Sequence, residues 1–175
     1  LTAWIDIDSD GFPDLVMGDR LYRNLGDGQF EDVSAAQGIA PNKNQYSWAA
    51  AWEDYDNDGD VDLYVANDYG PNCLYRNDGR RFVNIAATAG VEDYGSGMSV
   101  SWGDFNRDGR MDLYVSNMFS SAGERIAYQR RFQPEADREV RRQFQRHARG
   151  NTLFENVGDG TFRDVSVDRD VTMGR

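Results

Sequence analysis

Three short acidic stretches of this chain have the residue types and the spacing that could bind a metal ion. In one of them, DYDNDGDVDLYVAND at residues 54–68, aspartates alternate with other residues and the segment then continues directly into an apolar run. Such a density of like charge is unfavourable in a folded chain unless a cation compensates it. Ca²⁺ takes roughly six to eight oxygen ligands, and a loop with carboxylates at positions 1, 3, 5 and 9, a glycine at position 6 and a carbonyl oxygen at position 7 can wrap around it. These stretches therefore predict calcium sites.

The loop pattern occurs three times in phase, so we predict up to three calcium sites. Asn106 replaces a carboxylate in the third loop, which we expect to bind calcium most weakly. An EF-hand fits less well, because its glutamate at position 12 is replaced by Met17, Val65 and Val115. A solvated acidic turn without metal remains the alternative. The predicted ligands, with position 7 contributing its carbonyl oxygen, are Asp6, Asp8, Asp10, Phe12 and Asp14; Asp54, Asp56, Asp58, Asp60 and Asp62; and Asp104, Asn106, Asp108, Arg110 and Asp112.

The composition places the chain among acidic globular proteins. It has 175 residues, and 39% of them are hydrophobic, which is enough for the core of one domain. The net charge of −11 argues against nucleic acid or an anionic membrane as the partner of the whole surface, and it suits cations. No apolar run approaches the roughly eighteen residues that a membrane-spanning helix needs.

The elements that position the loops form a repeat of about 50 residues. A tryptophan stands two residues before each loop, and a strand-like segment follows it: DLVM, DLYVAN or DLYVSN. Then come LYRN, LYRN or LFEN and a glycine turn that leads to Phe30, Phe82 or Phe162. In the second repeat the four strand segments are SWAAAW, DLYVAN, CLYRN and RFVNIA. Four short antiparallel strands in a unit of this length are typical of a propeller blade, so we predict an all-β fold with three blades of a larger β-propeller.

The repeat also predicts the organisation of the chain. We place blade 1 at residues 1–45 with a truncated first strand, blade 2 at 46–94, blade 3 at 95–170 and the start of a next blade at 171–175. Propellers close with roughly four to eight blades, so we expect further blades or other chains to complete this one. Blade 3 contains an insertion at about residues 119–150, because 41 residues separate Asp112 from Leu153 where 12 separate Asp62 from Leu74.

The insertion is predicted to form a helix. Pro134 suits its first turn and Gly150 its end, while Asp137 with Arg141 and Glu139 with Arg142 have the spacing of helical ion pairs. A helix docked on the edge of the blade with one apolar stripe is the expected structure. The residues of that stripe are Ala136, Val140, Phe144 and Ala148.

Arginine dominates the charge of the insertion. The residues between Phe119 and Gly150 have a net charge of +4, whereas the rest of the chain has −15. A solvated helix face is the favoured interpretation. The alternative is a surface that pairs with an acidic face of another chain or with an anionic ligand, for which the candidate residues are Arg138, Arg141, Arg142 and Arg146.

The quoted motifs resemble those of a known family. DIDSDGFPDL, DYDNDGDVDLYV and DFNRDGRMDLYV, each followed by LYRN or LFEN and a GDGxF-like turn, are similar to FG-GAP or VCBS repeats, the calcium-loop blades of integrin α-chain propellers. The segments SNMFSSAGERI and HARGNTLFENVGDGTF resemble the bacterial branch, related to cartilage acidic protein, whose propellers precede an ASPIC/UnbV domain. The resemblance implies a seven-bladed propeller with calcium in its loops, used mainly for adhesion or protein recognition. The insertion has no integrin counterpart, so integrin-like ligand binding is not implied.

Two functions follow as hypotheses. The first is a calcium-stabilised module for protein–protein interaction or adhesion, located in the extracellular space, at the cell surface or in the periplasm, with a protein partner. The second is a carbohydrate-binding or carbohydrate-active propeller, in which Tyr46, Tyr69 and Tyr94 stack on a glycan. We expect no enzymatic activity, because HExxH, GxSxG and phosphate-loop motifs are missing and the single histidine, His147, suits a helix end.

Overall fold

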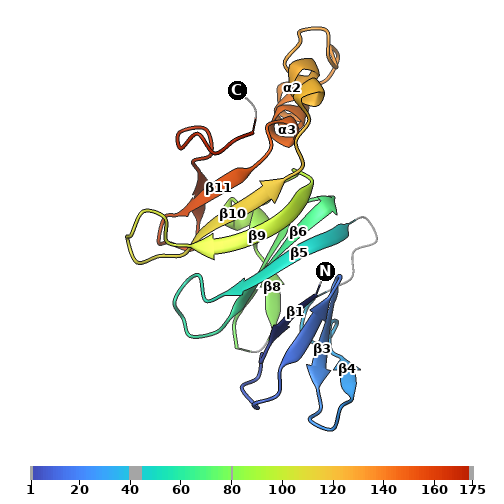
Figure 1. Cartoon of the computed structure of the whole chain (residues 1–175), viewed down its shortest axis with the longest axis vertical. Coiled ribbons are helices and arrows are strands. Elements are labelled where there is room, and N and C mark those ends of the chain that lie inside the picture. Colours follow the sequence, from blue (N-terminus) through green and yellow to red (C-terminus); the bar gives the residue numbers. More distant parts are fainter. Residues whose placement is uncertain (1, 40–44, 80, 174–175) are drawn as a thin grey trace.

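Three four-stranded antiparallel sheets make up the fold (Figure 1). The structure is a computed structural model that describes residues 2–39, 45–79 and 81–173. Within each sheet the strands are neighbours in the order of the chain, which confirms the predicted all-β fold of propeller blades. The sheets consist of β1 (Thr2–Ile5), β2 (Asp14–Met17), β3 (Arg20–Asn24) and β4 (Phe30–Asp32); β5 (Tyr46–Glu53), β6 (Asp62–Tyr69), β7 (Cys73–Asn77) and β8 (Phe82–Asn84); and β9 (Gly97–Gly103), β10 (Asp112–Asn117), β11 (Thr152–Asn156) and β12 (Phe162–Asp164).

The burial of the second strand in each sheet reflects its place between neighbouring blades. The first six residues of β6 are all buried, because blade 1 covers one face of blade 2 and blade 3 covers the other. Leu63 packs toward blade 1 and Tyr64 toward blade 3, as the alternation of side chains along a strand requires. In β2, by contrast, buried and more exposed residues alternate. Blade 2 therefore has the environment of an internal blade.

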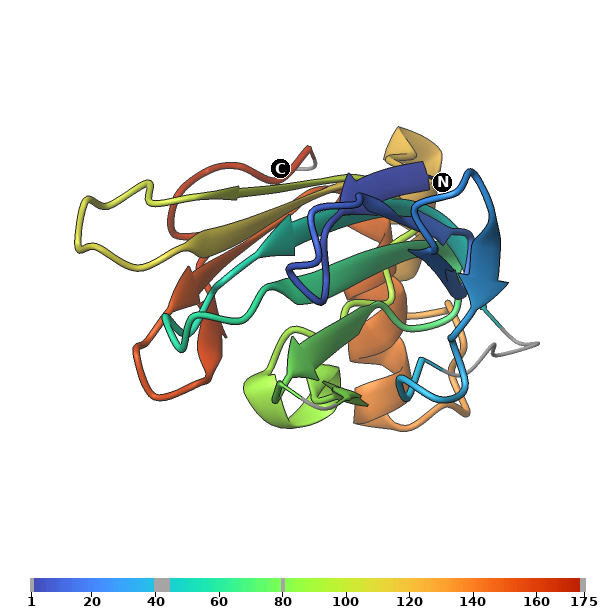
Figure 2. The same cartoon turned by 90° about the horizontal axis from the view of Figure 1, so that it is seen from below.

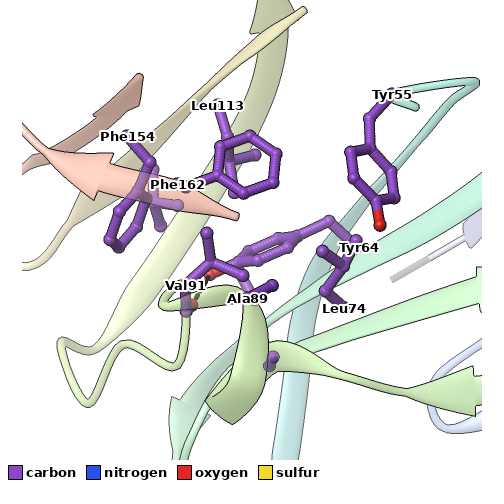
Figure 3. Close-up of a cluster of buried hydrophobic side chains, with 11 residues drawn as sticks. Tyr55, Tyr64, Leu74, Ala89, Val91, Leu113, Phe154 and Phe162 are labelled. Atoms are coloured by element: carbon purple, nitrogen blue, oxygen red, sulfur yellow. Dashed lines mark hydrogen bonds between the residues drawn. The ribbon is translucent and has the colours of Figure 1, made fainter. Parts of the chain in front are cut away.

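Two hydrophobic clusters join the blades. The cluster between blades 1 and 2 contains Val16 and Phe82, with Trp52 packed against it. Figure 3 shows the cluster between blades 2 and 3, in which the Tyr64 ring extends toward Val91 and its hydroxyl donates to the Val91 carbonyl oxygen at 2.9 Å. The core thus lies between the sheets and contains the inward-facing residues of the strands.

The acidic loops and the insertion lie at opposite ends of the strands. Each loop follows the first strand of its blade, and the three loops lie along the left and lower edges of the molecule in Figure 1. The insertion follows β10 at its other end and forms α2 (Ser121–Ala127) and α3 (Arg138–Ala148). Figure 2 shows the first strands β1, β5 and β9 together along one side of the molecule, in blue, teal and yellow.

The predicted start of the helix in the insertion is wrong. α3 begins at Arg138 rather than near Pro134, because Asp137 is the N-cap and its carboxylate accepts the N–H of Val140 at 2.8 Å. α2 was not predicted, and Ser120 caps it by accepting the N–H of Gly123. Helix ends depend on such local hydrogen bonds more than on the apolar stripe.

The two ion pairs predicted for α3 do not form among the described residues. Asp137 caps the helix instead, and the Arg141 guanidinium donates to the carbonyl oxygens of Gln133 and Pro134. The predicted fourth strand RFVNIA is also too long. β8 ends at Asn84, whose side chain accepts the N–H of Ala86, and the short helix α1 (Ala86–Ala89) follows.

Some predicted boundaries fall on residues outside the described part of the chain. Residue 1 and residues 40–44 belong to the predicted blade 1, and residues 174–175 belong to the predicted start of a next blade. None of the helices in the described ranges has the length and apolar character of a membrane span.

Candidate metal centres

The first aspartate of each loop folds the loop around its own carboxylate. In the second loop, Asp54 accepts the N–H of Asp58 through Oδ1 and the N–H of Gly59 through Oδ2, both at 3.1 Å. The first and third loops repeat both contacts at 2.9–3.1 Å. Asp58 in turn accepts the N–H of Asp60 at 2.9 Å, and position 5 does the same in the other loops. The three loops therefore share one set of backbone contacts.

Two residues with positive φ turn each loop. In the second loop these are Asn57 with φ of 59° and Gly59 with φ of 95°. An added Cβ at Gly59 would meet no atom within 4 Å, so its backbone conformation rather than crowding accounts for glycine at position 6. The corresponding residues of the other loops also have positive φ: Ser9, Gly11, Arg107 and Gly109.

Carboxylate oxygens converge in the first two loops. In each of these loops, one oxygen from each of three aspartates lies within 4.8 Å of the other two. A set of carboxylate oxygens suits Ca²⁺, which prefers hard oxygen ligands. Softer metals prefer nitrogen or sulfur ligands. The residues brought together are Asp6, Asp8 and Asp14 in the first loop, and Asp54, Asp56 and Asp58 in the second.

The electrostatics of the second loop favour a bound cation. Burial raises the pKa of Asp56 above its usual value, and the neighbouring carboxylates of Asp58 and Asp54 raise it further. Each of these effects penalises the ionised form of the carboxylate, and a nearby cation counteracts them. The residues present therefore fit the calcium ion that the loop pattern predicts.

The aspartate at position 9 is buried and connects the loop to the third strand. Asp62 is 0% exposed, and its two oxygens accept the N–H groups of Tyr55 at 3.3 Å and of Asn77 at 2.8 Å. Burial raises the pKa of Asp62 to about 7, although the two N–H donors oppose the shift. Asp14 and Asp112 are equally buried and accept the corresponding pairs of N–H groups. Position 9 thus anchors each loop.

The third loop differs from the other two in the partners of its carboxylates. The guanidinium of Arg110 lies 2.5 Å from Oδ2 of Asp108, and the Asn106 side-chain amide donates to the same oxygen at 2.9 Å. Among the described residues, no three carboxylates of this loop meet as they do in the other loops. A cation at this loop would have to compete with a positive side chain, which adds a structural reason to the prediction that it binds most weakly.

An asparagine in each blade supports the loop, and sequence reasoning gave it no role. Asn156 donates its backbone N–H to Asp112 and its side-chain amide to the carbonyl oxygens of Met111 and Tyr55 at 3.1 and 3.0 Å. Its Oδ1 accepts the N–H of Gly158 at 2.9 Å. The signal was present, because the asparagine ends the LYRN and LFEN motifs in all three repeats, and the other two copies are Asn24 and Asn77.

Two of the three predicted carbohydrate-stacking tyrosines line one hollow, and the third is the cross-strand partner of one of them. Tyr69 and Tyr94 line one hollow with Phe144 of α3, next to Asp68, Gln143 and His147. Tyr46 pairs with Tyr69 across β5 and β6 and is exposed. The ring nitrogen Nδ1 of His147 lies 2.7 Å from the Tyr94 carbonyl oxygen. This contact holds α3 against the connection that leads into β9.

The four arginines predicted to bind a partner have different environments. Arg141 donates to carbonyl oxygens of its own segment, and Arg146 lies 3.8 Å from the carboxylate of Asp164. Arg138 and Arg142 are exposed on α3. Within the described part of the chain, Arg138 and Arg142 are thus the members of the predicted set that make neither an ion pair nor a side-chain hydrogen bond.

The comparisons with known proteins concern the loops and the strands around them. A family model described as FG-GAP-like repeat matches residues 6–65 and 54–115. Each match begins at the first aspartate of a loop and ends in the second strand of the following blade, and together the two matches cover more than half of the chain. A search of curated proteins found no match.

Proposed function

Because the chain belongs to the FG-GAP-like repeat family, we propose that it is a calcium-binding β-propeller module for protein–protein interaction or adhesion. The observation that carries the proposal is the convergence of three carboxylates within 4.8 Å in each of the first two loops. Extracellular, cell-surface or periplasmic exposure goes with this function, because calcium is available there to sites of modest affinity.

The residues that would hold calcium are those that the loop conformation brings together. The carboxylates of Asp54, Asp56 and Asp58 would bind the ion, with the carbonyl oxygen of Asp60 as a further ligand, while Asp62 anchors the loop to β7. When bound, calcium supplies positive charge that compensates the clustered carboxylates. In the first loop the carboxylates that meet are those of Asp6, Asp8 and Asp14, so position 9 would bind the ion there together with positions 1 and 3. The third loop contributes least.

Recognition of a partner is assigned to the connections and the insertion, at the end of the blades opposite the loops. We propose a protein as the partner, with Arg138 and Arg142 as the residues of the insertion that reach it. The segments SNMFSSAGERI and HARGNTLFENVGDGTF also support a place in the bacterial branch whose propellers precede an ASPIC/UnbV domain. We propose that this module is not an enzyme.

A carbohydrate-binding function is the second candidate, because Tyr69, Tyr94 and Phe144 line one hollow with polar groups beside them. Exposed aromatic rings next to a carboxylate and an amide suit stacking on a sugar combined with hydrogen bonds to its hydroxyls. A glycan-array screen of the wild type and of Tyr69→Ala tests it. Binding that Tyr69→Ala abolishes would support this candidate, and a wild type that binds no glycan would reject it.

Isothermal titration with calcium tests the main proposal. Asp56→Asn is expected to weaken calcium binding at the second loop by at least about tenfold, which corresponds to about 1.4 kcal/mol. Asp60→Asn is the matched control, because it removes a neighbouring charge of the same loop and leaves the carbonyl ligand in place. Equal losses in the two variants would indicate non-specific attraction by net charge, and no calcium binding by the wild type would reject the proposal.

A further inference from the structure

The hollow between blades 2 and 3 combines three aromatic rings with one carboxylate. Blade 2 contributes Asp68 and Tyr69 from the end of β6 and Tyr94 from the connection to β9. The helix α3 contributes Phe144. The volume of the hollow is about 440 Å³, within the range of roughly 300–1,000 Å³ that is usual for ligand sites. Its walls come from two neighbouring blades of the described chain, so the hollow is an internal feature of the row of blades.

The rings form an open platform, and two of them are held by neighbouring residues. Tyr69 is 71% exposed, Tyr94 is 40% exposed and Phe144 is 41% exposed. The Phe144 ring lies 5.2 Å from that of Phe132 in an edge-on arrangement, and the Tyr94 hydroxyl donates to the Glu92 carboxylate at 3.2 Å. Rings that are already held in place lose little freedom when a ligand covers them. The platform therefore suits a ligand with a flat apolar face.

The carboxylate of Asp68 has no partner in the described part of the chain. It makes no ion pair and accepts no hydrogen bond there, although the residue is half-buried. An adjoining hollow along α3 adds the carboxylates of Glu92 and Glu139, while its cationic side chain, Arg146, lies 3.8 Å from Asp164. A half-buried carboxylate without a counter-charge is stabilised by a cation beside it. The charge of the hollow thus complements a positively charged ligand.

The remaining polar residues of the hollow can accept hydrogen bonds. The carbonyl oxygen of Tyr94 has no proton to give, so Nδ1 of His147 carries the proton in their 2.7 Å contact. In the neutral imidazole the other nitrogen, Nε2, is then an acceptor. Gln143 adds an amide oxygen. A ligand that fits these groups therefore combines an apolar face with a positive charge and hydrogen-bond donors.

We propose that this hollow binds a glycan whose sugar units carry free amino groups, such as an oligomer of glucosamine. The apolar face of a sugar ring would lie on the exposed aromatic rings, and its protonated amine would pair with Asp68. Charge-assisted hydrogen bonds are stronger than neutral ones, so the amine sets the preference among sugars. A lysine side chain supplies the same charge without a flat ring to stack. This inference rests on the second candidate function, glycan binding, and not on the proposed binding of calcium.

Two oligomers that differ only in acetylation test the proposal. In isothermal titration, a glucosamine tetramer should bind at least about tenfold more tightly than an N-acetylglucosamine tetramer, because acetylation removes the charge that pairs with Asp68. Asp68→Asn should abolish this preference. Asp168→Asn is the matched control, because it removes the same charge outside the hollow and should keep the preference. Tyr69→Ala should weaken the binding of both oligomers, and tetralysine should bind more weakly than the glucosamine tetramer.

The outcomes separate this inference from the functions on which it does and does not rest. Equal affinity for the two oligomers, or a preference that survives Asp68→Asn, would overturn the role of Asp68 and leave glycan binding standing. Tetralysine that binds as tightly as the glucosamine tetramer, or an equal loss in Asp168→Asn, would reduce the effect to the net charge of −11. A wild type that binds neither oligomer overturns the inference, and one that also binds no other glycan rejects the second candidate function. Calcium titration of Asp68→Asn should match that of the wild type.

Discussion

Replacing the asparagine at the end of the third strand by alanine should destabilise the three blades to different extents. Asn156 is 2% exposed and makes three side-chain hydrogen bonds, one of which reaches Tyr55 in the neighbouring blade. At a net value of about 0.5–1.5 kcal/mol for each hydrogen bond, Asn156→Ala should lower the free energy of unfolding by about 1.5–4.5 kcal/mol.

The same substitution at the other two repeats provides matched controls. Asn77 donates to Val61 at 3.3 Å and accepts from Gly79, so Asn77→Ala should cost about 1–3 kcal/mol. Asn24 makes its two side-chain hydrogen bonds in exposed surroundings, where water replaces them, and Asn24→Ala should cost less than about 1 kcal/mol.

Urea unfolding with chelator present measures the loss of unfolding free energy in each of the three variants. The expected order of destabilisation is Asn156, then Asn77, then Asn24, with similar dependence on urea concentration in all three. Equal effects, or the largest effect at Asn24, would refute the view that this residue supports the loop through buried hydrogen bonds.

Three further substitutions follow from the described contacts. Arg110→Ala frees a carboxylate of the third loop, so calorimetry should show calcium binding there that is at least about tenfold tighter. Burial raises the pKa of Asp164, but hydrogen bonds from Ser166 and Arg149 lower it overall. The contribution of Asp164 to stability is therefore present above its unfolded pKa and lost as the pH falls through the folded pKa. Asp164→Asn should make the urea midpoint depend less on pH below about pH 4. Phe162→Ala should cost about 3–5 kcal/mol in urea unfolding, because the ring is almost completely buried between two blades.

The blades and the loops were predictable because their signals are local. A glycine at position 6, alternating aspartates and strand segments of period two each impose one conformation on a short stretch, and three in-phase copies reinforce one another. The same local rules explain why DLYVAN was recognised as a strand although it is buried on both faces.

The errors and omissions concern side-chain contacts that exist only in the folded chain, whether the partners are near or far apart in the sequence. α3 begins where Asp137 caps it, and the apolar stripe alone could not distinguish Asp137 from Pro134 as the start. The contact between Arg110 and Asp108 requires the folded loop, so the sequence indicated a weaker third loop only through Asn106. The role of Asn156 depends on Tyr55, which lies 101 residues away in the chain.

The thermal unfolding midpoint, measured in excess chelator and across a calcium titration, tests the central claim most directly. A site saturated at about one hundred times its dissociation constant contributes about 2.7 kcal/mol to stability, so two occupied loops should raise the midpoint clearly and more than magnesium does. A calcium-selective rise that Asp56→Asn reduces is the predicted result. A midpoint that calcium leaves unchanged, with no ion bound to the folded chain, would contradict the account of the loops as metal centres.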